Sequence, residues 1–370
     1  MKKIAVFHPS SELYGADRIM VLSLKALNEY LPVIYLPSNG PLVHLIKKEI
    51  PWAIVNICPN MPLFYRDLKQ PKNALKFAKN MRSFSSFLEL EFSLHVFDKI
   101  YINTLACSPI LWLLRREKTF KIVHVHEILD RPQIARKITN RIILKHADKI
   151  ICVSHPVAEN ISNQQIDKIK IVNNGIPIID VRDAEADNMK IQFYLFGRIK
   201  PEKGQWYLLE AIKQLKKHEL KHVHFNLIGS PLTGKEQLLD ELLTEIKVNG
   251  LSEYISHKSF VADISSELSK ADVCLVPSQM KDPFPTTVLE AMSAKKPVIA
   301  TNHGGAVEAI HHGINGFLIS PNNANELTTA IRAFIENRQR IKSMGEKGFL
   351  LYKNQFTLEK FMERFTKAVA

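Results

Sequence analysis

The sequence contains little cysteine and no long apolar run. Its four cysteines, Cys58, Cys107, Cys152 and Cys274, lie far apart without a CxxC pair, which argues against a disulfide framework and a zinc cluster. We expect reduced and mostly buried thiols instead. No run reaches the roughly 18 apolar residues that span a bilayer, and the first run, residues 4–7, is too short for a signal peptide. The default expectation is therefore a cytoplasmic protein.

The length and composition indicate a globular chain with two hydrophobic cores. A chain of 370 residues exceeds one ordinary domain and suits two domains of roughly 150 to 200 residues each. Hydrophobic residues make up 46% of the chain and charged residues 24%, and the mean hydropathy is −0.08. This composition is neither disordered nor fibrous.

Basic residues exceed acidic residues, and the surplus lies in the N-terminal half. The chain has 50 Lys and Arg against 37 Asp and Glu, which gives a formal net charge of +13. Residues 1–180 hold 25 basic and 15 acidic residues, whereas residues 181–370 hold 25 and 22. Such a field attracts nucleic acid, anionic lipid or a phosphorylated substrate, and charge alone does not choose among these partners.

Short apolar runs alternate with helical or loop stretches along both halves of the chain. The predicted strands of the N-terminal half are residues 2–8, 31–37, 53–59, 99–103, 121–126, 148–154 and 169–175. A polar linker at 176–188 precedes a second series at residues 191–197, 222–229, 254–260, 271–278, 296–301 and 316–320, with helices near 204–217, 235–248, 287–294 and 324–343. Runs that are apolar on both faces predict parallel sheets covered on both sides. We therefore predict two doubly wound α/β domains, with a ligand cleft where the carboxyl ends of both sheets face each other.

Residues 277–320 contain the strongest candidate for a binding site. Asp282 is predicted in a loop after a strand, and Glu290 in a helix that begins near Thr286. Backbone N–H groups in the first turn of that helix, together with the helix dipole, favour an anion such as phosphate. Ionised carboxylates accept hydrogen bonds from hydroxyl groups, which favours a sugar or ribose. For an isolated pair of this spacing, a helix cap and an ordinary exposed glutamate would be the alternative.

This segment resembles the donor-binding region of the retaining nucleotide-sugar glycosyltransferases of family 4, which have the two-domain GT-B fold. The matching positions are Asp282, Glu290, Ala291, Met292, residues 297–301, Gly304, Gly305, Glu308, Gly313 and residues 316–318. Asp282 stands where Glu is commonest in the family. The resemblance implies an N-terminal, acceptor-side Rossmann-like domain over residues 1–178, joined by a C-terminal helix at 355–370, and a donor-binding domain over 189–350.

Further matches imply roles in binding the donor. Residues 197–204 (GRIKPEKG) resemble the family element whose Arg and Lys clamp the donor diphosphate, which assigns Arg198 and Lys203 to that task. Two fixed cations there would stabilise the charge that grows on the leaving group. The resemblance assigns the donor-sugar hydroxyls to Asp282 and the backbone of residues 284–286, and the ribose hydroxyls to Glu290. The implied donor-binding residues are Gly15, Gly197, Arg198, Lys203, Gly229, Phe260, Val261, Asp282, Phe284, Pro285, Thr286, Thr287 and Glu290.

The N-terminal half supplies two more matches. Residues 14–18 (YGADR) resemble the family's GGAER, in which glycine lets the first helix approach the donor phosphates, although Tyr14 replaces the first glycine here. Residues 121–128 (KIVHVHEI) resemble the strand whose end carries a histidine near the reacting sugar, and we map that histidine to His126 rather than His124. The implied catalytic residues are His126, Arg198, Lys203, Asp282 and Glu290.

Neither a metal nor a cofactor is expected. His124 and His126 alone could suggest a metal, but no third ligand is evident. Residues 229–236 (GSPLTGKE) follow a P-loop pattern until Glu236, which stands where a Ser or Thr should bind magnesium. The chain also lacks the D-x-D pair with which unrelated glycosyltransferases hold a divalent ion. We expect Arg198, Lys203 and helix dipoles to stabilise the leaving diphosphate instead.

The acceptor is expected to bind in the N-terminal half. Residues 71–90 predict an amphipathic helix with an apolar face formed by Ala74, Phe77, Ala78, Met81, Phe84 and Leu88, and with Lys72, Lys76, Lys79 and Arg82 beside it. Residues 61–66 add aromatic side chains that look exposed. Such a segment either lies in the interface of an anionic membrane or packs on its own domain with a solvated basic edge. We therefore expect a glycan acceptor, and our working hypothesis is that it is linked to a lipid at the inner face of the cytoplasmic membrane.

The resemblance thus implies a metal-independent retaining glycosyltransferase that uses a UDP- or GDP-linked sugar in lipopolysaccharide, capsule or glycolipid assembly. Three alternatives stay open. The acceptor could be soluble, the chain could be a related GT-B enzyme, or it could be a catalytically inactive nucleotide-sugar binder. A nucleic-acid partner is not expected, because the basic residues carry no recognised nucleic-acid-binding motif.

Overall fold

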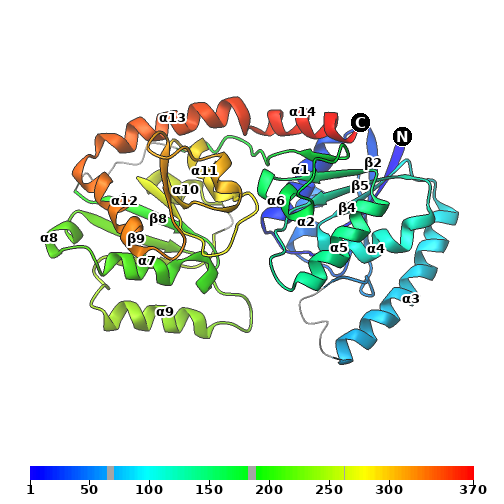
Figure 1. Ribbon diagram of the computed structural model, residues 1–370, viewed down its shortest axis with the longest axis horizontal. Coiled ribbons are helices and arrows are strands. Elements are labelled where there is room, and N and C mark those ends of the chain that lie inside the picture. The colour runs from blue at the N-terminus through cyan, green and yellow to red at the C-terminus, as the bar shows by residue number, and fades with distance from the viewer. Residues whose placement is uncertain (65–70, 182–188, 262) are drawn as a thin grey trace. The chain divides into compact units, whose positions relative to one another are not determined.

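The computed structural model describes residues 1–64, 71–181, 189–261 and 263–370, which fold into two compact units. The N-terminal unit comprises Met1–Asn174 with Glu359–Ala370, and the C-terminal unit comprises Gly175–Leu358 (Figure 1). Part of the predicted linker, residues 182–188, lies outside the described residues. The sequence placed the C-terminal return near residues 350–355, whereas the structure places it at 358.

The N-terminal unit is built on a seven-stranded sheet in the order β3-β2-β1-β4-β5-β6-β7. Every pair of neighbouring strands is parallel. The strands are β1 (Lys2–Phe7), β2 (Tyr30–Leu36), β3 (Ile54–Ile57), β4 (Lys99–Asn103), β5 (Phe120–Val125), β6 (Lys149–Cys152) and β7 (Ile169–Ile171). The predicted parallel sheet is confirmed, and each predicted strand is present, with bounds that are the same, shifted by one residue or shorter.

Helices connect these strands and cover the sheet. They are α1 (Gly15–Ala26), α2 (Pro41–Glu49), α3 (Pro71–Leu94), α4 (Ser108–Leu113), α5 (Gln133–His146), α6 (His155–Ile161) and α14 (Leu358–Val369). The chain winds outward from β1 to β3 and then returns to β4 on the other side of β1. Because parallel crossovers are right-handed, this reversal puts the helices of the two halves on opposite faces. The reversal between β1 and β4 is also where a doubly wound sheet opens a site beyond its carboxyl edge.

The core of the N-terminal unit contains strands whose side chains are buried on both faces of the sheet. Ile4 and Phe7 of β1 have no exposed surface, and Phe7 stacks on Tyr35 of β2 with ring centroids 4.8 Å apart. A strand buried on both faces needs apolar side chains on both, as β1 has. Helix α14 completes this core with Phe361 and Phe365, both fully buried. The C-terminal end of the chain is therefore an integral part of the N-terminal unit.

The C-terminal unit repeats the plan with a six-stranded parallel sheet in the order β10-β9-β8-β11-β12-β13. Its strands are β8 (Ile191–Phe196), β9 (Val223–Ile228), β10 (Ile255–Lys258), β11 (Val273–Val276), β12 (Val298–Thr301) and β13 (Gly316–Ile319). Its helices are α7 (Gln205–Ile212), α8 (Lys217–Leu220), α9 (Gln237–Val248), α10 (Ser265–Lys270), α11 (Thr286–Ser293), α12 (Ala324–Glu336) and α13 (Gln339–Gln355). The winding reverses between β8 and β11, which marks the second candidate site.

Two predictions about helices differ from the structure. The single helix predicted over 324–343 is two helices, α12 and α13, and α13 continues to Gln355. Residues 351–358 therefore belong to the C-terminal unit, where the Tyr352 hydroxyl donates to the carbonyl of Ile176 at 2.8 Å and Phe356 packs against Phe284. The final helix begins at Leu358, and Thr366 ties it to α1 through a hydrogen bond to the Ala26 carbonyl.

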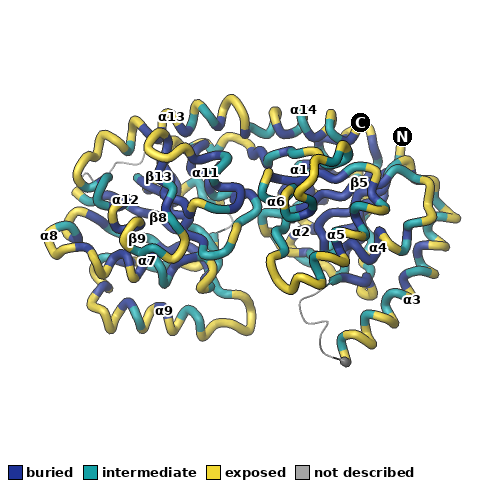
Figure 2. The backbone as a smooth tube through the Cα atoms, in the orientation of Figure 1, coloured by how far each residue is buried: buried dark blue, intermediate teal, exposed yellow. Residues whose placement is uncertain are grey.

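Helix α3 is only partly the amphipathic helix that the sequence predicts. Its C-terminal half packs on the sheet through the buried side chains of Phe84 and Leu88. In its N-terminal half, Ala74 and Ala78 of the predicted apolar face are exposed (Figure 2). The apolar stripe is thus continuous in sequence but is covered only over the half that reaches the sheet.

The expectation of exposed side chains at residues 61–66 is wrong for the described part of that segment. Met61 and Leu63 are buried, and Phe64 is half-buried because it stacks on Phe77 of α3 with ring centroids 5.4 Å apart. Residues 65 and 66 lie outside the described residues. Within the described ranges, none of the helices has the length and apolar character needed to cross a bilayer.

Candidate functional site

The predicted donor-binding residues of the C-terminal unit lie at the carboxyl ends of four strands. Gly197 and Arg198 follow β8, Gly229 follows β9, and Phe260 and Val261 lie beyond β10. The segment from Asp282 to Thr287 follows β11 and leads into α11. Because parallel strands end at one edge of a sheet, these residues share the carboxyl edge around the reversal between β8 and β11.

Two glycine positions hold these loops in close contact. Gly229 has a φ of +153°, and a Cβ there would lie 1.9 Å from the carbonyl oxygen of Gly197. Gly304 has a φ of +63°, and a Cβ there would lie 2.2 Å from the carbonyl oxygen of Asp282. The next residue, Gly305, donates its N–H to the same carbonyl at 2.8 Å. The backbone of the Asp282 loop is therefore fixed from behind by a pair of glycines.

Lys203 and Asp282 form an ion pair at this edge. The Nζ of Lys203 lies 2.5 Å from Oδ2 of Asp282, and the two side chains are 31% and 21% exposed. The sequence assigned Lys203 to a diphosphate and Asp282 to sugar hydroxyls, two different parts of a donor. The structure brings the two side chains together, so each is placed by the other before any ligand arrives.

A third basic residue, Lys200, belongs to the same cluster. Burial, followed by repulsion from Lys203, lowers the pKa of Lys200, and Arg198 adds to this repulsion. Its Nζ lies 3.8 Å from the sulfur of Met280 in the loop after β11. Sequence reasoning missed Lys200, although it lies within the same run as Arg198 and Lys203. We call Arg198, Lys200 and Lys203 the cationic cluster.

Helix α11 begins at Thr286, shortly after Asp282, the residue that pairs with Lys203 of the cluster. Pro285 is the N-cap residue and contributes no side-chain cap, and Thr286 and Thr287 in the first turn are half-buried. Phe284 is buried against Phe356 at a centroid distance of 5.7 Å, which anchors the loop. Glu290 is half-buried one turn after Thr286, on the same side of the helix. The N-terminus of an α-helix attracts anions, as expected for this segment.

The predicted histidine of the N-terminal unit lies at the carboxyl edge of its sheet. His124 is inside β5 and has no exposed surface, whereas His126 follows the strand and is half-buried. The centroids of the two imidazole rings lie 4.0 Å apart. Burial, followed by the neighbouring histidine His126, lowers the pKa of His124 well below its ordinary value. Of the two, only His126 reaches the surface, which agrees with the choice of His126 over His124.

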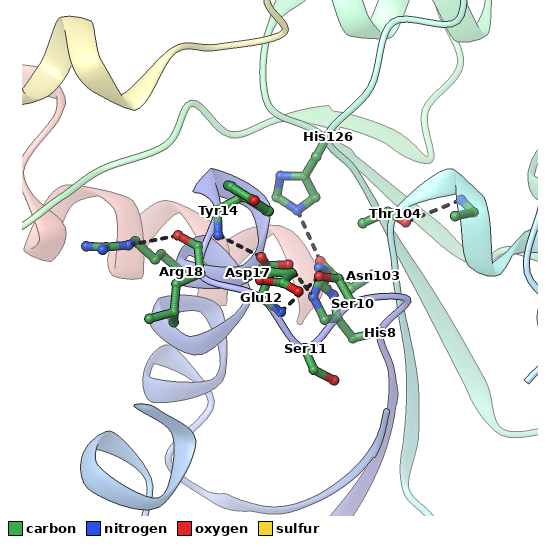
Figure 3. A network of polar contacts seen from close by, with 12 residues as sticks. His8, Ser10, Ser11, Glu12, Tyr14, Asp17, Arg18, Asn103, Thr104 and His126 are labelled. Atoms are coloured by element: carbon green, nitrogen blue, oxygen red, sulfur yellow. Dashed lines mark hydrogen bonds and ion pairs between the residues drawn. The ribbon is translucent and has the colours of Figure 1, made fainter. Parts of the chain in front are cut away.

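His126 is the end of a chain of polar side chains that the sequence did not reveal (Figure 3). Its Nε2 lies 3.0 Å from Oδ1 of Asn103, which ends β4. Nδ2 of Asn103 lies 2.8 Å from Nδ1 of His8, which follows β1, and Nε2 of His8 lies 2.7 Å from Oδ1 of Asp17 on α1. Asp17, His8 and Asn103 are 3%, 1% and 0% exposed. Asn103 ends an apolar run and His8 follows one, whereas Asp17 lies in the motif of residues 14–18; these were the only signals the sequence offered.

Asp17 also fixes the start of α1, where the sequence predicted a phosphate approach at Gly15. Its Oδ2 accepts a hydrogen bond from the backbone N–H of Tyr14 at 2.7 Å, and α1 begins at Gly15. Tyr14 is the N-cap residue, and 37% of it is exposed. The Asp17 carboxylate contacts both His8 and the backbone of Tyr14. It therefore connects the loop between β1 and α1 to the chain of polar side chains that ends at His126.

Two residues next to this chain of polar side chains, Thr104 and Glu127, have an unusual backbone conformation and a raised pKa, respectively. Thr104 follows Asn103 with a φ of +76°, a left-handed conformation that a β-branched residue rarely adopts. Glu127 follows His126, and its carboxylate accepts N–H groups of Leu105 and His126 at 3.1 Å each. Burial raises the pKa of Glu127, against the effect of these bonds. Local strain of this kind clusters at functional sites.

The remaining sequence features have structural roles. All four cysteines are free thiols, and three of them are buried. In the P-loop-like segment, the Glu236 carboxylate accepts the N–H of Gly234 at 2.9 Å. No group of three or more potential metal-ligating side chains occurs among the residues that the structure describes. A separate groove runs between α5 and α6 and is lined by the basic side chains Arg136, Lys137, Arg141 and Lys145.

Comparison with known proteins places the candidate donor site within a known domain. Residues 179–351 match the family Glycosyl transferases group 1. An uncharacterized glycosyltransferase of Methanocaldococcus jannaschii is 29% identical over 303 residues, which cover 80% of this chain and 79% of that protein. The lipopolysaccharide 1,2-N-acetylglucosaminetransferase of Salmonella typhimurium is 26% identical over 211 residues, 53% of this chain and about half, 55%, of that protein.

Solved structures extend the similarity over both units. The crystal structure of HepE from Anabaena in complex with UDP and glucose matches with a TM-score of 0.83 at 22% identity, covering 99% of each chain. At this identity the match establishes the fold, and it covers the seven-stranded and six-stranded sheets alike. The chain therefore has the GT-B fold that the sequence predicted, and the match of residues 179–351 to Glycosyl transferases group 1 supports glycosyltransferase activity.

Proposed function

We propose that this chain is a retaining glycosyltransferase that transfers a sugar from a UDP- or GDP-linked donor to a hydroxyl group of a lipid-linked glycan. The observation that carries the proposal is the cationic cluster beside the loop of Asp282 and the N-terminus of α11, within the matched domain. The UDP and glucose bound to the Anabaena relative support a nucleotide-sugar donor. The Salmonella relative's name supports a glycan acceptor of the cell surface.

In this proposal the C-terminal unit binds the donor by charge. Arg198 and Lys203 hold the diphosphate, and the first turn of α11 adds N–H groups and the positive end of the helix dipole. Glu290 accepts hydrogen bonds from the ribose hydroxyls, and Asp282 from those of the transferred sugar. Negative charge grows on the diphosphate as the glycosidic bond to the sugar breaks. Cations fixed at that position stabilise the transition state more than the ground state.

Retention of configuration follows if the acceptor attacks the face from which the diphosphate leaves. The anomeric carbon loses its bond to the diphosphate oxygen, passes through an oxocarbenium-like state and forms a bond to the acceptor oxygen. The acceptor hydroxyl gives its proton to the departing phosphate. This route requires neither a carboxylate nucleophile nor a metal ion, since the cationic cluster stabilises the leaving group.

Helix α3 supports the membrane part of the proposal. In its exposed N-terminal half, Leu75 is 73% exposed, and Lys72, Lys76 and Lys79 are exposed around it. An apolar side chain surrounded by lysines suits the interface of an anionic leaflet, where each lysine contributes about 1 kcal/mol. A protein bound in this way would lie on the inner face of the cytoplasmic membrane, next to a lipid-linked acceptor.

The test of the donor class is a panel of UDP- and GDP-sugars in two assays. Thermal melting should show stabilisation by one nucleotide, because a ligand that binds only the folded state raises Tm. Release of that nucleoside diphosphate in the presence of an acceptor should then show turnover. Stabilisation without release under any acceptor condition would favour a catalytically inactive nucleotide-sugar binder. Absence of both would contradict the proposal.

The membrane proposal is tested by flotation with vesicles of phosphatidylglycerol and phosphatidylcholine. Replacing Lys72, Lys76 and Lys79 by glutamine should reduce binding, and replacing the exposed Lys221, Lys235 and Lys247 of the C-terminal unit is the charge-matched control. Replacing Arg136, Arg141 and Lys145 tests the groove on α5 in the same way. Equal losses in all three variants would mean nonspecific charge attraction, and no wild-type binding would favour a soluble acceptor.

A further inference from the structure

We propose that Asp17, His8 and Asn103 are positioning residues that hold His126 as one neutral tautomer, protonated on Nε2, so that its Nδ1 accepts a hydrogen bond from a substrate hydroxyl group. The inference rests on the proposed function, because it concerns how the N-terminal unit contacts a sugar or acceptor hydroxyl. It adds His8 and Asn103, which lie outside the sequence motifs, and it gives a role to Asp17 of the motif at residues 14–18. The chain of contacts is drawn in Figure 3.

The starting point is the carboxylate of Asp17, which can only accept hydrogen bonds when ionised. Its Oδ2 accepts the Tyr14 N–H, and its Oδ1 faces Nε2 of His8 at 2.7 Å. Nε2 of His8 must therefore carry a proton. If His8 is neutral, its Nδ1 is then an acceptor, and it faces Nδ2 of Asn103 at 2.8 Å. The amide of Asn103 consequently presents its oxygen to His126.

That oxygen fixes the proton on His126. Oδ1 of Asn103 lies 3.0 Å from Nε2 of His126, and the hydroxyl of Tyr101 approaches the same oxygen at 3.1 Å. A carbonyl oxygen accepts from both, so Nε2 of His126 donates. Within the described chain, no residue forms a hydrogen bond with Nδ1 of His126. This nitrogen is the acceptor left for a ligand.

The reverse orientation of the Asn103 amide is the alternative, since such orientations follow from the network of hydrogen bonds. It would turn the amide oxygen toward Nδ1 of His8, which would then need protons on both nitrogens. That orientation would make His8 an imidazolium paired with the Asp17 carboxylate, with both side chains almost fully buried. His8 would gain a charge that the first orientation does not require.

His124 discriminates between the two orientations. Its Nδ1 lies 2.7 Å from the Tyr101 hydroxyl, and its Nε2 is buried without a partner among the described residues. With the Asn103 oxygen toward His126, Tyr101 donates to Asn103 and accepts from Nδ1–H of His124, so the unpaired Nε2 is a bare acceptor. In the reverse arrangement Tyr101 donates to His124, and the unpaired Nε2 carries a hydrogen. Buried N–H groups without a partner are the rarer case.

The surroundings of His126 keep it uncharged. The polar and titratable groups facing it are His8 and Asp17 from β1 and α1, Asn103 from β4, and His124 and Glu127 from β5 and its loop. Burial lowers the pKa of His126. A neutral imidazole can orient a hydroxyl by accepting its hydrogen. Its lowered pKa makes His126 a weak base, in agreement with a reaction in which the phosphate takes the acceptor's proton.

The experiment is nitrogen NMR of the full chain labelled with ¹⁵N-histidine, without substrate at pH 7, with His126 assigned from the spectrum of His126→Gln. The wild type should show His126 protonated on Nε2 and unprotonated on Nδ1. Asn103→Ala should give a mixture of tautomers. Asn140→Ala is the matched control, because it removes an amide bonded to the carbonyls of Asn160 and Ile161 in the same unit and should leave the His126 signals unchanged.

Two results would overturn the inference. One is a wild-type His126 that carries its proton on Nδ1 or on both nitrogens, and the other is an unchanged tautomer in a folded Asn103→Ala. If Asn103→Ala does not fold, Asn103→Asp keeps the shape of the side chain and should raise the pH at which His126 becomes protonated; no change would equally overturn it. Because these spectra need no activity, an inactive enzyme would contradict the proposed function alone. In an active enzyme, Asn103→Ala should lower kcat about tenfold with little change in donor KM.

Discussion

The two units collect polar groups at equivalent places, the carboxyl edge of a parallel sheet where its winding reverses, but they use opposite kinds of groups. In the N-terminal unit the side chains from Asp17 to His126 are largely buried and are joined by hydrogen bonds. In the C-terminal unit the ion pair of Lys203 and Asp282 is partly exposed. The difference follows from desolvation. An ionisable group near water keeps its charge, whereas a buried group is favoured in its neutral form unless its charge is paired.

The comparison separates two tasks. Fixed cations stabilise charge that develops during a reaction, whereas a neutral, rigid network orients groups without changing their charge. Changes in the cationic cluster should therefore alter rates strongly. Changes in the neutral network should alter orientation, tautomers and the pH dependence of stability.

The largest effect is expected from Lys203→Ala. Removing one fixed cation from the leaving diphosphate should lower kcat by about 10² to 10³, the usual size for one preorganised electrostatic contact. Lys235→Ala, an exposed lysine of the same unit, is the control. Steady-state kinetics with the nucleotide-sugar identified in the donor panel would measure both. A loss of less than threefold for Lys203→Ala would remove Lys203 from the charge-stabilising role.

Glu290→Ala should have the next largest effect. A carboxylate that accepts two ribose hydroxyl hydrogen bonds contributes about 1.5 to 3 kcal/mol, so kcat/KM should fall roughly 10- to 100-fold, with a higher donor KM. Glu253→Ala removes an exposed carboxylate of the same unit and should change neither constant. Turnover near that of the wild type would contradict the assignment of Glu290 to the donor.

The neutral network predicts a pH dependence of stability. The pKa of His126 is lowered in the folded chain, mainly by burial, whereas an unfolded histidine titrates near 6.5. Below about pH 6.5 the unfolded chain therefore binds more protons, and folding stability is lost as the pH falls. Urea unfolding at pH 7.5, 6.5 and 5.5 should show this loss.

His126→Gln isolates the contribution of this residue, because Glu127 has a raised pKa and acts in the opposite direction at lower pH. The variant should lose less stability than the wild type between pH 7.5 and 5.5. His44→Gln, at an exposed position of the same unit, should follow the wild type. Parallel curves for wild type and His126→Gln would mean that His126 takes up its proton equally well in both states.

The same comparison explains what the sequence could predict. In the C-terminal unit, Asp282, Glu290, Gly304 and Gly305 lie within one short run, and the two glycines are required by backbone contacts with the Asp282 loop. The resemblance of this run to a known family therefore indicated a site before any fold was known. The parallel sheets were equally predictable, because strands buried on both faces are continuous apolar runs.

The site of the N-terminal unit could not be assembled from spacing. His8, Asp17, Asn103 and His126 come from three strands and a helix, and only the strand order β1-β4-β5 makes them neighbours. The sequence left open how much of α3 would be covered, for a similar reason. A stripe of apolar residues indicates a buried face, but whether a surface covers it depends on how far the helix extends beyond the sheet.

The smallest predicted effect concerns Asp282→Asn. If Lys203 binds the diphosphate, the nucleotide competes with Asp282 for the Lys203 ammonium group, which is 2.5 Å from the carboxylate. A partly exposed ion pair contributes about 0.2 to 1 kcal/mol, so Asp282→Asn should bind the free nucleoside diphosphate about 1.5- to 5-fold more tightly. Turnover of the nucleotide-sugar should fall at the same time, because the sugar loses a charged hydrogen-bond acceptor. Titration calorimetry with the nucleoside diphosphate would measure the first effect.

Glu202→Gln, which removes an exposed negative charge next to Lys203 in sequence, controls for the general electrostatic field. Weaker binding by Asp282→Asn would mean that the carboxylate holds Lys203 in position for the diphosphate rather than competing with it, and the ion pair of the C-terminal unit would then serve orientation as the neutral chain of the N-terminal unit does.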